Sequence, residues 1–188
     1  MARPSEYDLD QVLNQVMEVF WKNGYEGTSV GELVEASKLN TRSMYNLFGD
    51  KKGLFHSSLD HYREKFLNSR IEILKKKPGL EGVQALFDLV AESNLFNGCL
   101  FSNTLSESNV VDEESTDRAK SYFGALENQL CKNLRHAKRC GEFAGDVKWT
   151  SKFLVCLLQG MGIYFKQKPS VSGKKKIFET ALKFIETR

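Results

Sequence analysis

Apolar residues recur at helical spacing along almost the whole chain, and this periodicity limits the possible folds more than any other feature of the sequence. Over residues 9–20 they occupy positions i, i+3, i+4, i+7, i+8 and i+11, which lie on one face of an α-helix. Similar stripes follow, separated by stop signals such as KKKPG at 75–79 and CGEFAGD at 140–146. No segment alternates apolar and polar residues as a strand would. The sequence predicts an all-α protein of about nine helices.

The composition indicates a soluble protein with its own core, because 41% of the 188 residues are hydrophobic. The longest apolar run, over 153–165, is too short to cross a bilayer and is interrupted by a glutamine and two glycines. No stretch has the pattern of a signal peptide, and the cysteines, Cys99, Cys131, Cys140 and Cys156, form no CxxC pair. We therefore expect a cytoplasmic protein with free thiols.

Helix caps divide the first fifty residues into three short helices. Ser29 and Glu32 have the spacing of a capping box, in which each side chain bonds the other residue's backbone amide. Asn40 caps a third helix of about seven residues, Gly49 ends it, and Asp50 caps a fourth helix. Two short helices joined by a four-residue turn are typical of a helix-turn-helix.

The third helix has a polar outward face. Its predicted inward residues are Leu39, Met44, Leu47 and Phe48. The residues left on or beside the outward face are Thr41, Arg42, Tyr45 and Asn46, donors of the kind that bind base edges and phosphates. Net charge is only +3, but residues 36–55 hold four cations and one acid, which makes a local positive face. The alternative is an ordinary solvated helix face.

The stretch NGYEGTSVGELVEASKLNTRSMYNLFGDKKGLF, residues 23–55, resembles the DNA-binding domain of the tetracycline-repressor (TetR) family of transcription regulators. The resemblance implies that Thr28, Tyr45 and Lys51 contact phosphates. It also makes Thr41, Arg42, Ser43 and Asn46 candidates to contact bases. The full predicted DNA-contacting set is Thr28, Ser29, Lys38, Asn40, Thr41, Arg42, Ser43, Tyr45, Asn46, Lys51 and Lys52.

Two residues depart from the family pattern. Lys38 stands in the turn where the family usually has glycine, so it must adopt a left-handed backbone at some cost, or the turn differs. Lys38 is equally a candidate for an added phosphate contact. Arg42 stands where a small residue is common, which makes it the first candidate for a base-reading side chain.

The resemblance further implies two domains and a homodimer. Residues 1–50 would bind DNA, and residues 51–188 would bind a ligand and dimerise, with the helix from residue 51 linking the two. Helices over 146–167 and 172–187 would pair with their symmetry mates through apolar stripes, unless those stripes face their own core. The expected function is a repressor that binds a palindromic operator in double-stranded DNA and is released by a small-molecule inducer. The residues do not distinguish repressor from activator.

The predicted ligand-binding residues are mostly aromatic, although such residues are often plain core. They are Phe96, Cys99, Phe101, Tyr122, Phe123, Phe153 and Tyr164. Cys99 follows a helix break and starts another helix, where a thiol becomes reactive, so a repressor that senses oxidants or electrophiles through Cys99 is an alternative. The opposing interpretation is a small buried apolar residue.

Other chemistry has little support in the sequence. His136 and Cys140 have i, i+4 spacing, but two ligands do not make a metal site, and we expect neither metal nor cofactor. No GxSxG elbow or glycine-rich phosphate loop occurs, so an enzyme is not expected. A helical carrier or enzyme that does not bind DNA is the remaining alternative. Lys75–Lys77 and Lys174–Lys176 are predicted to be solvated helix ends rather than a second anion site.

Overall fold

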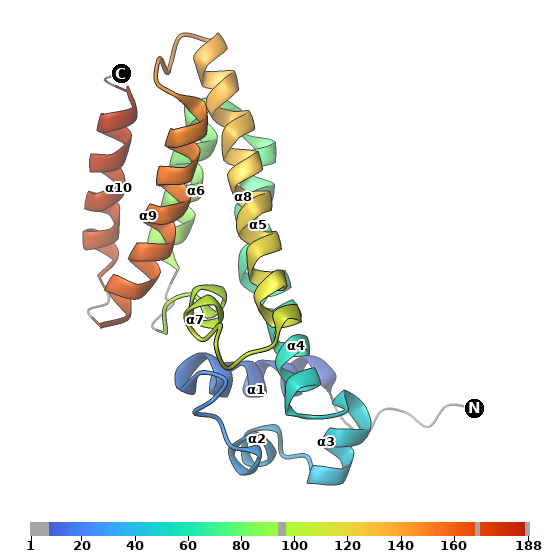
Figure 1. The fold of residues 1–188 in the computed structure, drawn as a ribbon. Coiled ribbons are helices and arrows are strands. Elements are labelled where there is room, and N and C mark those ends of the chain that lie inside the picture. Colours follow the sequence, from blue (N-terminus) through green and yellow to red (C-terminus); the bar gives the residue numbers. More distant parts are fainter. Residues whose placement is uncertain (1–7, 94–96, 168–169, 187–188) are drawn as a thin grey trace.

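The computed structural model describes residues 8–93, 97–167 and 170–186, and in this part of the chain every regular element is a helix. Three short helices lie at the lower end of Figure 1: α1 (Leu9–Asn23), α2 (Val30–Ser37) and α3 (Thr41–Phe48). The chain then rises through α4 (Lys51–Tyr62), the π-helix η1 (Arg63–Leu67) and α5 (Asn68–Lys76). The remaining helices are α6 (Gly79–Glu92), α7 (Leu100–Ser106), α8 (Glu113–Arg139), α9 (Val147–Gln167) and α10 (Val171–Glu186).

The predicted caps are confirmed. Ser29 Oγ accepts the Glu32 amide at 3.2 Å while the Glu32 carboxylate accepts the Ser29 amide at 2.7 Å, which completes the capping box. The Asn40 side chain accepts the Ser43 amide at 2.8 Å, and Asp50 caps α4 at the Gly53 amide. These bonds satisfy amides that a helix start otherwise leaves free, so they fix where each short helix begins.

The helix predicted to run from Lys51 to the KKKPG stop follows that path but contains a π-helical turn at η1. Counted as one continuous helix, α4, η1 and α5 bring the described helices to the nine expected. We call α1, α2, α3 and the first turns of α4 the head. Its core joins α1 to α4, where Phe20 and Phe55 meet edge to face with ring centroids 4.9 Å apart.

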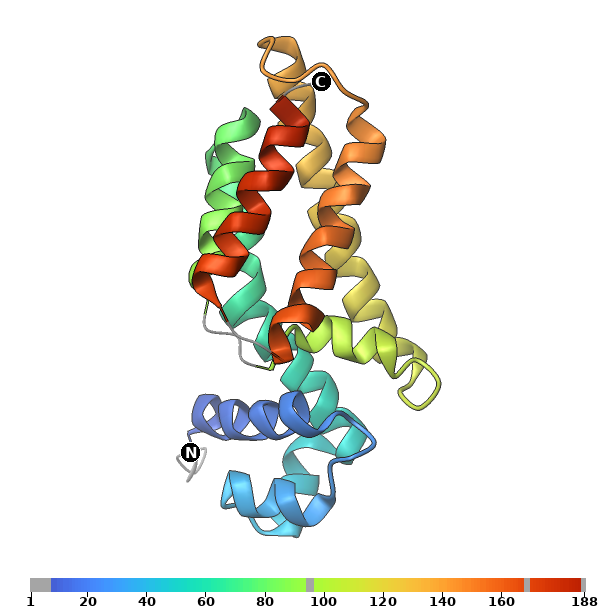
Figure 2. The same ribbon diagram turned by 90° about the vertical axis from the view of Figure 1, so that its left-hand side faces the viewer.

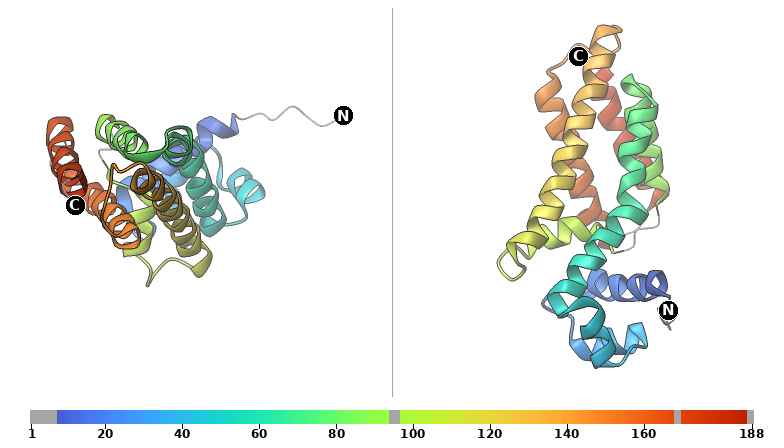
Figure 3. Two further views of the ribbon diagram at one scale, coloured as in Figure 1. Left: turned by 90° about the horizontal axis from the view of Figure 1, so that it is seen from above. Right: turned by 90° about the vertical axis from the view of Figure 1, so that its right-hand side faces the viewer.

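Above the head, α5, α6, α8, α9 and α10 run roughly upright, and α7 lies across their lower end (Figure 1). Seen from above in Figure 3, α6 lies between α5 and α10, and it packs against both as well as against α8. Phe87 of α6 stacks on Phe178 of α10 with centroids 4.2 Å apart. Helix α7 contacts α4, α8 and α9, so it is in contact with both the head and the upright bundle.

Two predicted faces differ from the structure. Leu47 is 47% exposed, because a helix as short as α3 reaches the core only through the side of Met44 and Phe48. The α10 stripe faces its own core, with Phe178, Ala181 and Leu182 buried, because α6 covers that side of the helix. The exposed apolar residue of α10 is instead Phe184, at 63%.

Candidate DNA interface

Helix α3 carries its polar residues on the surface and is anchored by buried residues beneath them. Met44 and Leu39 are buried. The exposed residues of the helix include Thr41, Arg42, Tyr45 and Asn46, with Ser43 half-buried beside them. The predicted polar face is therefore accessible, and its side chains project from an element fixed at both ends by Asn40 and Gly49.

The turn between α2 and α3 takes the left-handed conformation, one of the two outcomes expected for it. Lys38 has φ of 56° and ψ of 14°, in the left-handed region, and among the described non-glycine residues it is the one with positive φ. Its side chain is exposed beside α3. The chain thus tolerates a strained lysine where glycine would be relaxed.

The lysines at the start of α4 differ in their surroundings. The Lys51 ammonium lies 4.5 Å from the centre of the Tyr25 ring, which holds it by a cation–π contact. Lys52 is more exposed, with its ammonium 3.9 Å from the Asp112 carboxylate. Both lie on the first turn of α4, where the helix dipole also favours an anion.

Thr28 and Ser29 take part in the loop that leads into α2. Thr28 is 2% exposed, and its hydroxyl donates to the Gly24 carbonyl at 2.6 Å. Ser29 is exposed, but its hydroxyl is engaged in the capping box. The Thr28 hydroxyl therefore closes the α1–α2 loop rather than lying on the surface.

The α7–α8 turn contacts this same loop from the side of the bundle. Glu107 Oε2 accepts the Tyr25 amide at 2.8 Å. Gly24 has φ of 77°, a conformation that favours glycine, and a Cβ there would displace the Glu107 carboxylate from its present position. The head is thereby hydrogen-bonded to the end of α7.

A histidine and two carboxylates meet where α4 approaches the start of α8. His56 Nε2 lies 3.0 Å from Asp112 and His56 Nδ1 lies 3.6 Å from Glu114. Burial raises the pKa of Asp112, but hydrogen bonds from His56 and Ser115 outweigh burial and hold that pKa at about 2. This cluster has no local sequence pattern, because His56 lies on α4 and is far in the chain from Asp112 and Glu114 at the start of α8. It is the one group of three potential metal ligands among the described residues.

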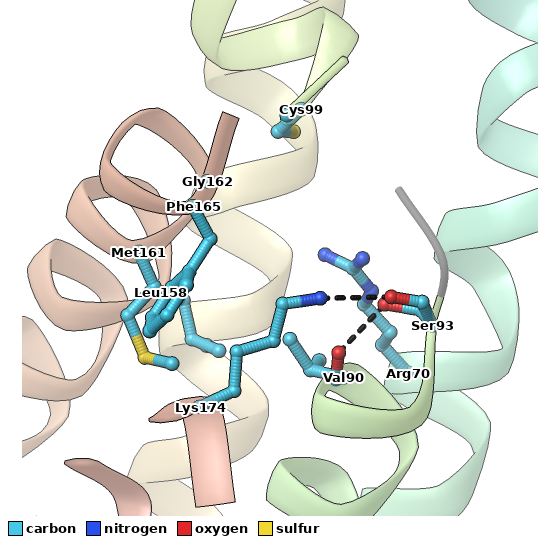
Figure 4. Close-up of a pocket in the computed structure, with 10 residues that line it drawn as sticks. Arg70, Val90, Ser93, Cys99, Leu158, Met161, Gly162, Phe165 and Lys174 are labelled. Carbon is cyan, nitrogen blue, oxygen red and sulfur yellow. Dashed lines mark hydrogen bonds between the residues drawn. The ribbon is translucent and has the colours of Figure 1, made fainter. Parts of the chain in front are cut away.

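A cavity opens between α5, α6, α9, α10 and the segment before α7 (Figure 4). The space between its atoms is about 370 Å³ when the part that opens to solvent is included. Its lining residues are Arg70, Val90, Ser93, Gly98, Cys99, Leu158, Met161, Gly162, Phe165 and Lys174. Arg70 and Lys174 were not among the predicted ligand-binding residues. Lys174 was expected to be a solvated helix end, and that expectation is wrong because its side chain lies along the cavity wall.

Of the predicted ligand-binding residues, Cys99 lines this cavity. Phe101 and Tyr122 are buried in the core beyond it, and Phe123 is partly buried. Phe153 and Tyr164 are 47% and 65% exposed on α9, and Phe153 borders a separate surface hollow with Trp149 and Phe184. Phe96 lies outside the described residues.

Comparison with known proteins adds to this geometry. Residues 12–57 match the family model of bacterial regulatory proteins of the tetR family, and residues 80–167 match that of the tetracyclin repressor-like C-terminal domain. The regulator YezE of Bacillus subtilis, a protein described as uncharacterized, is 30% identical over 156 residues, which cover 78% of each chain. This chain belongs to the TetR family.

Two further relatives extend along nearly the whole TetR-family chain. The repressor ComR of Escherichia coli K12 is 29% identical over 97% of this chain and 90% of its own. A cysteine mutant of the TetR family regulator CifR, solved with 26-bp double-stranded operator DNA, is 28% identical. It covers 98% of this chain and 100% of its own, with a TM-score of 0.83. The protein is thus a DNA-binding transcription regulator and not an enzyme.

The family assignment also bears on the predicted alternatives. Cys99 is 7% exposed, whereas Cys140 and Cys156 are exposed, so the thiol predicted to sense oxidants is among the least accessible. Neither the structure nor the relatives favour the redox alternative. Among the described residues, no helix is long and apolar enough to cross a membrane.

Proposed function

We propose that this TetR-family regulator is a homodimeric, cytoplasmic repressor that binds an approximately palindromic operator and is released from it by a small molecule. The observation that carries the proposal is the exposed donor face of α3 on a buried scaffold. The relative ComR is named a repressor, and CifR was solved on operator DNA. Within the chain, we assign DNA binding to residues 1–50, and ligand binding and dimerisation to residues 51–188, linked by α4.

In this proposal α3 enters the major groove. Arg42 and Asn46 are the first candidates for base contacts, since a guanidinium can bind guanine and an amide can bind adenine through two hydrogen bonds. Thr41, Ser43 and Asn40 lie around them at the start of the helix. Tyr45, Lys51, Lys52, Lys38 and Ser29 are assigned to the phosphates on either side. Thr28 acts indirectly, because its hydroxyl fixes the loop that carries Ser29.

The proposed dimer interface lies on α9 and α10, which stand together at the front of Figure 2. Trp149, Phe153, Tyr164 and Phe184 expose between 47% and 67% of their surface there. Gly160 has open space where a side chain would stand, which allows a second helix to approach closely. Large aromatic side chains on one face indicate an interaction surface, and a two-fold pair would place two α3 helices in successive major grooves.

The proposed release mechanism uses the contact between α7 and the head. Cys99 is the residue at which α7 begins and it lines the cavity, while Glu107 at the other end of α7 binds the Tyr25 amide. A ligand that fits one position of α7 better than another changes how the head is held. It weakens DNA binding by its difference in affinity for the two states and by no more.

The test starts by selecting duplexes from a random library with the purified protein and measuring affinity by fluorescence anisotropy. Arg42→Ala should weaken binding to the selected duplex about 10- to 100-fold, because one bidentate base contact contributes roughly 1–3 kcal/mol. Arg139→Ala is the matched control, since Arg139 is an exposed arginine at the far end of α8. Trp149→Asp should yield monomers in analytical ultracentrifugation. The proposal fails if no duplex is enriched, or if Arg42→Ala and Arg139→Ala bind alike.

A further inference from the structure

The cavity combines an apolar wall with two cationic side chains. Leu158, Met161 and Phe165 of α9 form one side, and Val90 of α6 lies opposite. The Arg70 guanidinium reaches in from α5 and the Lys174 ammonium from α10, and Figure 4 shows both directed into the same space. Cavities of this kind, mostly apolar with a few convergent polar groups, are typical small-molecule sites.

Arg70 is buried without a counter-charge. It is 8% exposed, and no carboxylate in the described part of the chain forms an ion pair with it. The Tyr122 hydroxyl lies beside the guanidinium. Neither this hydroxyl nor that of Tyr62 makes a hydrogen bond of regular geometry within the described residues. A buried cation among unused donors is costly, and an acceptor carrying negative charge would relieve that cost.

Lys174 differs from the two lysines that follow it. Lys175 pairs with Glu92 at 3.1 Å, and Lys176 pairs with Glu179 at 3.4 Å. Lys174 instead donates to the Ser93 carbonyl at 2.8 Å, which leaves the rest of its ammonium facing the cavity. Burial lowers the pKa of Lys174, and the nearby positive charge of Arg70 lowers it further. The two cations are thus held together against their mutual repulsion.

We propose that this cavity binds a small organic acid, with its carboxylate between Arg70 and Lys174, and that such an acid is the effector of the regulator. The effector role rests on the proposed function above. A carboxylate can accept two parallel hydrogen bonds from a guanidinium and one more from an ammonium. The body of the acid packs on Leu158, Met161 and Phe165, and the narrow space between these side chains and Val90 limits it to a small molecule. Cys99 in the same wall connects the acid to α7.

The acid preference is tested by isothermal titration calorimetry on the full chain, in a buffer free of other carboxylates and of phosphate. The probes are benzoate, phenylacetate, hexanoate and octanoate, each paired with its uncharged primary amide. At least one acid should bind ten or more times more tightly than its amide. Arg70→Met and Lys174→Met should each remove that preference, whereas Lys175→Met, one residue away and paired outside the cavity, should keep it.

Thermal unfolding without ligand shows whether these variants fold. Arg70→Met should unfold at or above the wild-type temperature, because it removes an unpaired buried charge. Arg70→Lys keeps a cation and should retain part of the preference for acids. The proposal is overturned if every acid binds no better than its amide, or if Arg70→Met and Lys174→Met keep the wild-type preference.

The same probes added to the protein–duplex complex separate this inference from the proposed function. An acid that binds in calorimetry should weaken duplex binding at least several-fold. Tight acid binding without any change in duplex affinity overturns the effector role. Failure of the free protein to bind any selected duplex instead overturns the proposed function, and the calorimetric preference for acids is then unaffected.

Discussion

The head and the cavity both present cations, but in opposite surroundings. Arg42 and Lys52 of the head are exposed, and their charges are solvated before any partner arrives. Arg70 of the cavity is buried and Lys174 beside it is half-buried, and neither has a carboxylate partner among the described residues. The cations of the head and those of the cavity are therefore suited to different anions. Exposed cations suit an extended polyanion, while cations held inside a cavity suit a small anion of matching shape.

The head and the cavity should differ most in how their binding depends on salt. Binding of duplex DNA releases condensed counterions, so affinity should fall roughly a thousandfold between about 50 and about 200 mM salt if six or more phosphates are contacted. A carboxylate in the cavity should lose only a few-fold, because buried pairs are screened much less than exposed ones. Anisotropy for DNA and calorimetry for the acid, run in the same chloride series, measure both slopes. Equal slopes would contradict the distinction between the two sites.

The second prediction concerns Glu107, which joins the two regions. Glu107→Ala leaves the Tyr25 amide without its acceptor, which should lower the free energy of unfolding by about 1–3 kcal/mol. It should also uncouple duplex release from ligand binding, because α7 loses its bond to the head. Urea unfolding and the ligand response in anisotropy are the two measurements. Glu107→Gln retains an oxygen that can accept the hydrogen bond from the amide. Its free energy of unfolding and its ligand response should both lie between those of Glu107→Ala and the wild type.

The third prediction concerns Asp112, which lies where α4 of the head meets α8. Its pKa is about 2 in the folded protein against 3.8 ordinarily, so its contribution to stability is present above pH 4 and is lost as the pH falls from about 4 toward 2. Asp112→Asn can still cap α8 but carries no charge. Asp112→Asn should lower the free energy of unfolding by on the order of 1–2 kcal/mol at pH 7 and by much less near pH 2, as urea unfolding would show. Asp117 is an exposed acid of the same helix, and Asp117→Asn should leave the free energy of unfolding unchanged at both pH values.

Most of the head could be predicted from its sequence, because its structure depends on neighbours in the chain. The Ser29 and Glu32 capping box, the Asn40 cap and the left-handed Lys38 each depend on a few consecutive residues. Leu47 and the buried Thr28 are exceptions, and the exposure of Leu47 depends on how little of a two-turn helix the core can cover. Contacts between the head and the bundle, such as Glu107 with Tyr25, join residues far apart and leave no local pattern.

The cavity could not be predicted for the same physical reason. Lys174 lies in a run of three lysines that looks like a solvated helix end, and packing against α6 turns it inward. Arg70 lies on a helix that ends with two exposed lysines, and its burial depends on α6 and α8. Aromatic residues gave little guidance. Tyr122 fills the core and Tyr164 faces out, although both occur in similar helical patterns.

The smallest expected effect concerns Lys38, the head cation with a strained backbone. Left-handed backbone costs a lysine roughly 1 kcal/mol that glycine avoids, while glycine makes the unfolded chain more flexible. Lys38→Gly should therefore stabilise the protein by under about 1 kcal/mol, a rise of about 1–3 °C in Tm by calorimetry. Asparagine tolerates this conformation better than lysine, so the Tm of Lys38→Asn should lie between those of the wild type and Lys38→Gly. If Lys38 also contacts a phosphate, both variants should weaken DNA binding equally and reduce the salt slope by about one. Unchanged DNA affinity in both would leave Lys38 with a role in the turn alone.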